Sequence, residues 1–385
     1  MRQARERTPL HAARQLKSRI VLLAVLSGLV GFDLLPGGIL PQGLAAPRTP
    51  VVHRRIRHSR RRRIRRRWSP WLVSSYDRDP GAGDITEGDD AGVRQAAIRA
   101  LGNLNGSIVV VDPNDGRILT IVNQKLAFSG AFRPCSTFKP IVALAALNEG
   151  IITPQTKLYV GRRSRMDLTE ALAHSNNRFF YKLGQMVGFH ILSRYAVEFG
   201  LGEKAGLDIK GDLPGEFPAE SPIDGEVGYL AYLGKGIEVT PLQWAAVASA
   251  FANGGTLYYL QYPQTQGQMA NFQPQVRRQL TNLQAQFPGV SAGMAAAVSY
   301  GTARLANDGV VQILGKTGTC SEDGARLGWF LSYSDAPRRY VVVVLLRGGR
   351  PMDGPHAAEI AGRLYEGLQQ VVPNELQETK TLLGQ

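Results

Sequence analysis

The stretch Ser107-Ile-Val-Val-Val-Asp-Pro-Asn-Asp-Gly-Arg-Ile-Leu-Thr-Ile-Val122 decides the fold, because it joins two apolar runs through a short turn. Its centre, Asp112-Pro-Asn-Asp-Gly116, is typical of a hairpin, so the two runs are predicted to be antiparallel strands. Two more strand-like runs, Gly328–Tyr333 and Tyr340–Leu346, lie far downstream. Strands from both ends of the chain, with helical patterns between them, indicate one antiparallel sheet in an α+β arrangement.

Apolar residues recur with helical spacing in several segments around these strands. The spacing predicts a helix over Val93–Leu101 before the hairpin and another over Ala357–Val371. A third helix is predicted over Ser136–Asn148, where Gly150 ends the pattern, and a fourth over Leu168–Ala173. The sheet is therefore expected to carry a mostly helical insertion.

Three short strings point to acyl-transfer chemistry: Ser136-Thr-Phe-Lys139, Ser175-Asn-Asn177 and Lys316-Thr-Gly-Thr319. On a helix, Ser136 and Lys139 lie on one face, so the amine can reach the hydroxyl. A serine becomes a nucleophile only when a base takes its proton. Lys139 can be that base if burial and a neighbouring positive charge, for which Lys316 is the candidate, lower its pKa.

Each string also has an ordinary structural explanation. Ser136 would stand at a helix N-terminus, where free N–H groups stabilise developing negative charge, but a serine there is more often only an N-cap. Ser175 and Asn177 fit a polar loop after a helix equally well. The chemical interpretation therefore depends on the three strings occurring together.

Together, Pro134-Cys-Ser-Thr-Phe-Lys-Pro140, Ser175-x-Asn177 and Lys316-Thr-Gly-Thr319 resemble the three motifs of the penicillin-recognising serine acyltransferases. Other stretches resemble the penicillin-binding protein transpeptidase branch, and the resemblance covers about residues 93–372. It implies an antiparallel five-stranded sheet flanked by helices, as in β-lactamases and transpeptidases. The other stretches are Asn105–Leu119, Gly200–Asp208, Leu213–Gly215, Gly234–Gln243, Phe251–Leu257 and Tyr300–Ala303.

Carried over residue by residue, the resemblance implies catalytic roles for the first two motifs. Ser136 would be the nucleophile and Lys139 its general base. Ser175 would relay the proton to the leaving amine. Asn177 would bind the peptide amide of the substrate or orient Lys139.

The third motif is implied to bind substrate. Lys316, with the hydroxyls of Thr317 and Thr319, would hold a substrate carboxylate. Gly318 would let the substrate lie close to the strand. The backbone N–H groups of Ser136 and Thr319 would form the oxyanion hole.

The implied reaction is attack by Ser136 on the D-alanyl-D-alanine bond of a peptidoglycan stem peptide, which gives an acyl-enzyme. An amine of a second stem then forms a cross-link, as in a D,D-transpeptidase, or water releases the acid, as in a D,D-carboxypeptidase. β-Lactams are expected to acylate the same serine as inhibitors. No cofactor is implied, and the six histidines show no metal-ligand spacing.

A serine β-lactamase and a non-catalytic penicillin-binding sensor are the alternative functions. A β-lactamase must hydrolyse its acyl-enzyme quickly. However, no Glu-x-x-Leu-Asn string like the class A deacylation motif lies between the second and third motifs, and Glu170 lacks that context. Class D enzymes usually have Val in the position of Asn177. The sequence therefore favours cross-linking over β-lactam hydrolysis.

The two cysteines flank the motifs, with Cys135 directly before the nucleophile and Cys320 directly after Thr319. Some class A carbapenem-hydrolysing β-lactamases have a disulfide between cysteines at matching positions. The resemblance therefore implies a Cys135–Cys320 bridge, which an oxidising compartment would permit. Two unrelated buried thiols are the alternative.

Most of the positive charge belongs to an N-terminal leader. Residues 1–67 carry 17 Lys and Arg against two acidic residues, whereas the whole chain has a net charge of +14. The charge thus gives no support for nucleic-acid binding by the rest of the chain. A basic start, an apolar run over Ile20–Phe32 and a Pro/Gly-rich stretch predict a signal peptide or membrane anchor over residues 1–46. This run is shorter than the roughly 20 residues that a membrane span needs.

Residues 47–92 are predicted to be a disordered linker rich in Arg, Pro, Gly and Asp. Its segment Arg54–Arg67 is either a solvated linker or is attracted to a membrane or an anionic envelope polymer. A transpeptidase domain over 93–373, with a surface excursion at the Gln-rich residues 261–286, and a tail over 374–385 are expected to follow. The protein is expected in the cell envelope, in the periplasm or on the periplasmic face of the inner membrane, as a minimal enzyme that relies on cell-wall synthesis partners.

Overall fold

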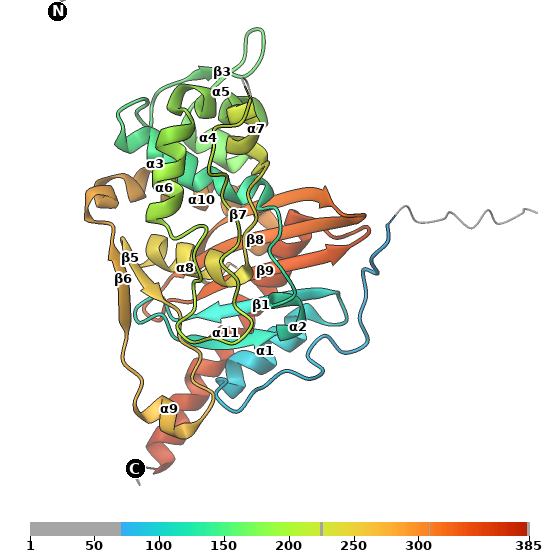
Figure 1. Cartoon of the computed structure of the whole chain (residues 1–385). Helices are drawn as coiled ribbons and strands as arrows, with labels where there is room; N and C mark the ends of the chain where they lie inside the picture. Colours follow the sequence, from blue (N-terminus) through green and yellow to red (C-terminus); the bar gives the residue numbers. More distant parts are fainter. Residues whose placement is uncertain (1–70, 224–225, 308, 383–385) are drawn as a thin grey trace, which may run out of the picture. The chain divides into compact units, whose positions relative to one another are not determined.

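Five antiparallel strands form the central sheet of the protein. The computed structural model describes residues 71–223, 226–307 and 309–382. The strands follow the order β2-β1-β9-β8-β7, and helices pack on both faces (Figure 1). The predicted sheet from both chain ends is confirmed, and the strand with the third motif, β7, lies at its edge. The strands are β1 (Gly106–Val111), β2 (Ile118–Val122), β7 (Gln312–Glu322), β8 (Ala325–Asp335) and β9 (Val341–Gly348).

Both faces of the sheet are buried, which explains why its strands are continuous apolar runs. In β1, Val109 belongs to one hydrophobic core, whereas its neighbour Ile108 belongs to a second core. The second core contains α1 (Ala91–Leu101) and the first part of α11 (Gly354–Leu382). The first core contains the buried side chains of the helical insertion.

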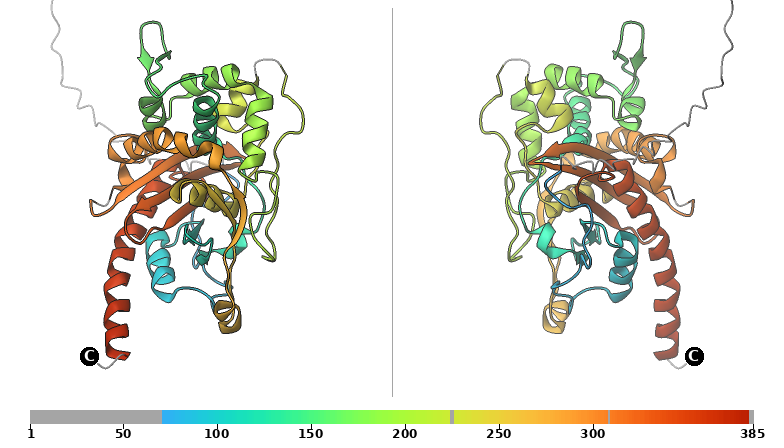
Figure 2. Two further views of the ribbon diagram at one scale, coloured as in Figure 1. Left: turned by 90° about the vertical axis from the view of Figure 1, so that its left-hand side faces the viewer. Right: turned by 90° about the vertical axis from the view of Figure 1, so that its right-hand side faces the viewer.

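The insertion carries the second motif, between α4 and α5. A hairpin of β3 (Leu158–Tyr159) and β4 (Arg165–Met166) projects from it, at the end of the domain opposite to the end of α11 (Figure 2). The helices that contribute to the first core are α3 (Lys139–Asn148), α4 (Leu168–Ala173), α5 (Asn177–Val187), α6 (Phe189–Glu198), α7 (Glu226–Leu233), α8 (Pro241–Ala252) and α10 (Phe287–Ser299).

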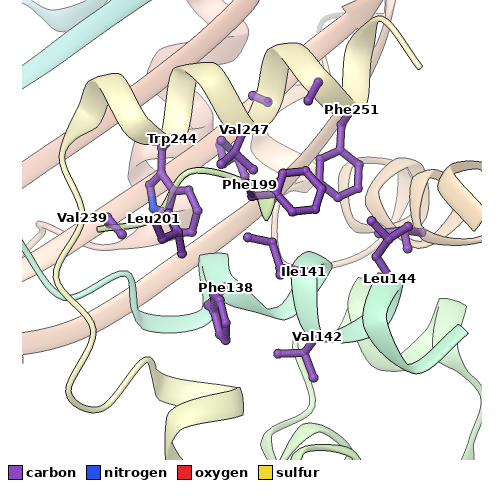
Figure 3. Close-up of a cluster of buried hydrophobic side chains, with 14 of the residues drawn as sticks. Phe138, Ile141, Val142, Leu144, Phe199, Leu201, Val239, Trp244, Val247 and Phe251 are labelled. Carbon is purple, nitrogen blue, oxygen red and sulfur yellow. The ribbon is translucent and has the colours of Figure 1, made fainter. Parts of the chain in front are cut away.

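Helix α8 is buried along its whole length and supports the segment that bears the first motif. The side chains of Thr240 and Gln243 form a capping box at its start. Phe138 and Ile141, from either side of Lys139, lie in the same apolar cluster as Trp244 of α8 (Figure 3). The position of the first motif is therefore set by the packing of large apolar side chains.

Two expected domain boundaries differ in the structure. Residues 71–90, which the sequence assigns to the linker over 47–92, lie against the domain, and Tyr76 forms a β-bridge with Leu104. This segment packs because its backbone and carboxylate groups have partners there. Helix α11 continues through most of the tail expected over 374–385.

The Gln-rich residues 261–286 form an excursion with its own secondary structure. They contain α9 (Gln266–Ala270) and β6 (Gln275–Gln279), and β6 pairs with β5 (Thr256–Tyr259) outside the main sheet. Most of the glutamine side chains are exposed, as expected for a surface excursion.

The leader, with the expected export signal and the Arg54–Arg67 segment, lies outside the described residues, so its role stays a prediction. Within 71–223, 226–307 and 309–382, no helix has the length and apolar character that crossing a membrane requires. The same ranges contain no cluster of His, Cys, Asp and Glu suited to a metal ion.

A buried ion cluster joins residues 84–89 and the Gln-rich excursion to the β1–β2 hairpin. Arg94 of α1 forms salt bridges of 2.8 and 2.9 Å with Asp84 and Asp89, whose side chains are each 2% exposed. It also donates a hydrogen bond to the carbonyl of Ile121 in β2. Tyr262 of the excursion donates another to Asp89. Burial raises the pKa of Asp89 even though these hydrogen bonds oppose the rise.

Replacing Arg94 with Met is expected to lower the free energy of unfolding by about 3–5 kcal/mol, because it leaves two buried carboxylates without their cation. Urea denaturation followed by circular dichroism measures this change. Arg99→Met, at an exposed position of the same helix, is the control and is expected to change stability by less than about 0.5 kcal/mol. Equal effects of the two substitutions would contradict the role assigned to Arg94.

Candidate active site

The first motif forms a tight turn followed by a helix. Cys135–Phe138 is a 3-10 turn, η1, and α3 begins at Lys139, so the helix expected from Ser136 onward is wrong in its first turn. Neither η1 nor α3 has a side-chain cap, which excludes the N-cap explanation for Ser136. Ser136 is half-buried, and its hydroxyl donates a hydrogen bond to the carbonyl of Tyr232 at 3.4 Å.

The second motif lies between the two lysines of the other motifs. Lys139 is fully buried, and its Nζ lies 2.7 Å from the carbonyl of Ser175, 3.0 Å from the hydroxyl of Ser175 and 2.8 Å from Oδ1 of Asn177. Lys316 is also fully buried, and its Nζ lies 2.8 Å from the same hydroxyl. The three strings are therefore brought together around Ser175.

A local turn gives Ser175 this position. Its backbone is left-handed, with φ of 51°, and Asn176 caps α5 by accepting a hydrogen bond from the N–H of Phe179. The carbonyl and the hydroxyl of Ser175 can therefore both contact Lys139. Ser175 and Asn177, for which a polar loop was the alternative explanation, both contact buried lysines, whereas Asn176 between them is the N-cap of α5.

Burial controls the charge of both amines. It lowers the pKa of Lys139 well below its ordinary value, and the charge of Lys316 lowers it further. Burial also lowers the pKa of Lys316, to about 7. Within the described part of the chain neither amine forms a salt bridge, so no anion opposes these shifts. The predicted effect of Lys316 on Lys139 is present, but it is the smaller of the two causes.

The partners of Lys139 suit a neutral amine, which has two N–H groups and one lone pair. The carbonyl of Ser175 and Oδ1 of Asn177 can accept the two N–H groups. The hydroxyl of Ser175 can donate to the lone pair while it accepts a hydrogen bond from Lys316. Among the described residues, no hydrogen bond joins Lys139 to Ser136, so the expected direct contact is absent in this state.

The third motif contacts the start of α11 and the segment that follows α10. The hydroxyl of Thr317 is 2.7 Å from that of Thr302, and the hydroxyl of Thr319 accepts a hydrogen bond from the N–H of Gly354 at 2.8 Å. Lys316 also donates to the carbonyl of Thr317 at 2.8 Å. The bonds to Thr302 and Gly354 fix the positions of the Thr317 and Thr319 hydroxyls on β7.

Gly318 has a structural role that the sequence did not indicate. A Cβ at this position would lie 2.9 Å from the carbonyl oxygen of Pro134 and 3.1 Å from the methyl group of Thr137. The glycine therefore lets η1 approach β7, rather than providing space for substrate alone. Trp329 of the neighbouring strand adds a hydrogen bond from its indole N–H to the carbonyl of Arg133 at 3.0 Å.

A disulfide between Cys135 and Cys320 links η1 to β7, with the two Cα atoms 5.7 Å apart and a sequence separation of 185. The expected bridge is present, and the alternative of two unrelated thiols is wrong. One cysteine precedes Ser136 and the other follows Thr319, so the bridge links the two segments whose N–H groups are assigned to the oxyanion hole.

Sequence reasoning missed Tyr232 and Thr302. Tyr232 contacts Ser136 through its backbone carbonyl, for which a side-chain motif carries no signal. Thr302 belongs to the stretch Tyr300–Ala303, which resembles a transpeptidase segment but indicated no contact with Thr317.

The family model described as "Penicillin binding protein transpeptidase domain" matches residues 106–366. The chain belongs to this family. The penicillin-binding protein transpeptidase domain thus accounts for the sheet, the insertion and all three motifs.

Curated relatives agree with this assignment. The transpeptidase domain is 28% identical to stage V sporulation protein D of Bacillus subtilis, over 66% of this chain and 45% of that protein. It is 23% identical to peptidoglycan D,D-transpeptidase MrdA of Acinetobacter baumannii, over 73% of this chain and 51% of that protein. The chain therefore spans about half the length of these relatives.

Solved structures show the same fold. The transpeptidase domain of Burkholderia pseudomallei penicillin-binding protein 3 aligns with a TM-score of 0.64 at 19% identity, over 74% of this chain and 96% of that one. Pseudomonas aeruginosa PBP2 in complex with WCK 5153 aligns with a TM-score of 0.63 at 23% identity, over 74% and 75% of the two chains.

The stability of the transpeptidase domain is expected to rise with pH from about 7 to 9. Lys316 has a folded pKa of about 7, below its unfolded value of roughly 10.4, so the unfolded state binds more protons in this window. Lys316→Met is expected to reduce the slope of the unfolding free energy by up to about 1.4 kcal/mol per pH unit. Urea denaturation at several pH values tests this, and an unchanged slope would contradict the depressed pKa.

Loss of the disulfide is expected to lower the free energy of unfolding by up to about 5 kcal/mol, because the bridge closes a very long loop in the unfolded chain. Denaturation of the Cys135→Ser/Cys320→Ser variant measures this, and treatment of both proteins with a reductant is the control. Reductant should destabilise only the wild type. A wild type that is insensitive to full reduction would contradict the stabilising role.

Proposed function

We propose that this protein is a serine D,D-transpeptidase that cross-links peptidoglycan stem peptides. The observation that carries the proposal is the burial of Lys139, with a depressed pKa, between Ser175 and Asn177 and three residues from Ser136. The D,D-transpeptidase MrdA relatives support the substrate class. Serine acylation and the choice of acceptor are inferred from the chemistry of the site.

In the acylation step, Ser136 attacks the carbonyl carbon of the penultimate D-alanine of the donor stem. Its hydroxyl leaves the carbonyl of Tyr232 and turns toward Lys139, whose lone pair takes the proton. The bond from the serine oxygen to the carbonyl carbon forms, and the bond to the terminal D-alanine nitrogen breaks. Ser175, which contacts both lysines, passes a proton to that nitrogen.

Binding of the donor is assigned to β7 and to the start of η1. Lys316, Thr317 and Thr319 hold the terminal carboxylate, and Asn177 binds the preceding peptide amide through its side chain. The N–H groups of Ser136 and Thr319 stabilise the tetrahedral oxyanion, where loss of one donor typically costs about 3–4 kcal/mol. The disulfide supports this function because it connects the two segments that supply these N–H groups.

The second step decides between three outcomes. An amine of a second stem gives the cross-link, water gives carboxypeptidase activity, and fast hydrolysis of β-lactams would define a β-lactamase. Glu170, the carboxylate considered for deacylation, instead accepts a hydrogen bond from Tyr300 at 2.7 Å and pairs with His174 at 3.4 Å. These contacts favour a slow hydrolysis, and therefore cross-linking.

A cell-envelope location follows from the proposed substrate. Peptidoglycan stems are cross-linked outside the cytoplasmic membrane, and the Cys135–Cys320 disulfide suits an oxidising compartment. Attraction of Arg54–Arg67 to a membrane or anionic polymer, and reliance on cell-wall synthesis partners, belong to the same proposal.

Fluorescent penicillin is expected to label the wild type covalently and to leave Ser136→Ala unlabelled, because only Ser136 becomes acylated. Gel fluorescence after denaturation measures the label. Ser221→Ala, at an exposed loop position, is the control and should label fully. Labelling of Ser136→Ala, or no labelling of a folded wild type, would overturn the assignment.

The rates of labelling and of label loss then separate the candidate functions. A transpeptidase is expected to lose the label far more slowly than it acquires it. Label loss as fast as acylation would identify a β-lactamase instead.

A further inference from the structure

A cavity of about 420 Å³ adjoins the reacting groups, and the steps above use only its residues Asn177 and Tyr232. Helices α5 and α7 and the residues that follow β3 line it. Two of its lining residues are Asn177, which contacts Nζ of Lys139, and Tyr232, whose carbonyl contacts the hydroxyl of Ser136. The cavity therefore begins beside the nucleophile, and its volume suits a small ligand or a short peptide segment.

Three tyrosines form one aromatic wall of the cavity. The ring of Tyr181 lies 5.4 Å from that of Tyr229 and 6.4 Å from that of Tyr232, and the last two rings are 5.7 Å apart. A Cβ at Gly228 would come within 2.4 Å of the Tyr181 ring, so the glycine lets α5 and α7 approach closely at this wall. The wall is thus a packed part of the domain.

Cations face the same cavity. Arg178 and Lys182 are four residues apart on α5, on one face of the helix, and both line the cavity. In the described part of the chain neither forms a salt bridge, and the one hydrogen bond of their side chains runs from Arg178 to the carbonyl of Val160. Arg165 stacks over the ring of Tyr159, another lining residue. The lining contains no Asp or Glu, so the cavity carries unneutralised positive charge.

We propose that this cavity binds the part of the donor stem peptide that precedes the scissile bond, and that Arg178 and Lys182 pair with a side-chain carboxylate of that part. The inference rests on the proposed function and specifies its substrate. Asn177, assigned to the peptide amide of the donor, lies in the lining, so the donor chain continues from Asn177 into the cavity. Arg178 and Lys182, with no carboxylate beside them in the lining, suit a carboxylate of the bound chain, and the tyrosines cover the aliphatic part of the side chain that bears it.

Two synthetic donors that end in D-Ala-D-Ala test the proposal. They differ only in the preceding residue, which carries a side-chain carboxylate in one donor and its primary amide in the other. Released D-alanine gives kcat/KM for each. The wild type is expected to prefer the carboxylate donor by about fivefold, and Arg178→Gln/Lys182→Gln is expected to bring the ratio near one.

The control is Lys204→Gln/Lys210→Gln, which removes the same charge at exposed positions outside this cavity and should keep the preference. A second measurement on the wild type alone raises the salt concentration, which should lower the ratio by screening the pair. This arm gives a result even if the cavity variant fails to fold.

Different results would contradict the cavity assignment and the proposed function. A wild type that penicillin labels but that shows no preference, or a preference unaffected by salt, overturns the cavity assignment alone. A preference that follows the carboxylate when it is placed on the acceptor peptide overturns the donor assignment. A wild type that neither takes the label nor releases D-alanine overturns the proposed function.

Discussion

Two fully buried lysine amines share one serine hydroxyl, and the rest of the structure depends on this contact. Removing an ammonium group from water is costly unless hydrogen bonds replace the lost hydration. Here the carbonyls of Ser175 and Thr317 and the amide of Asn177 supply those bonds. They come from the turn between α4 and α5 and from β7. The helical insertion and the sheet edge must therefore stay in one relative position, and that position buries Lys139 and lowers its pKa.

The approach of η1 to β7 is a second constraint, and several independent contacts support it. Gly318 leaves room for the carbonyl of Pro134, and the indole of Trp329 donates a hydrogen bond to the carbonyl of Arg133. The disulfide joins η1 to β7 covalently. On the other side, Phe138 packs in the same apolar core as α8. Ser136 in η1 is thus held between the sheet and a buried helix, and the proposed oxyanion hole requires this rigidity.

Beyond these constraints, the two sides of Asn177 differ in character. One side is the closed network of lysines and hydroxyls, in which every polar contact is short. The other side is an open aromatic cavity with cations that have few partners. A closed network suits chemistry that is common to a family, whereas an adaptable cationic cavity suits discrimination between substrates. The proposed catalysis and the proposed substrate discrimination therefore lie on opposite sides of Asn177.

The sequence by itself determined the sheet from both chain ends, the order of the motifs and the residues that are proposed to react. Apolar runs, turn residues and short strings are local signals, and each survives in the structure with small shifts of its bounds. The sequence could not show that the first motif begins with a 3-10 turn, or that residues 71–90 pack on the domain. Both features follow from contacts with distant segments. Only the tertiary structure decided that Lys139 bonds to Ser175 and Asn177 while Ser136 bonds to Tyr232. Hydrogen-bond partners, burial and the cavity depend on how separate elements pack, and no local pattern of residues records that packing.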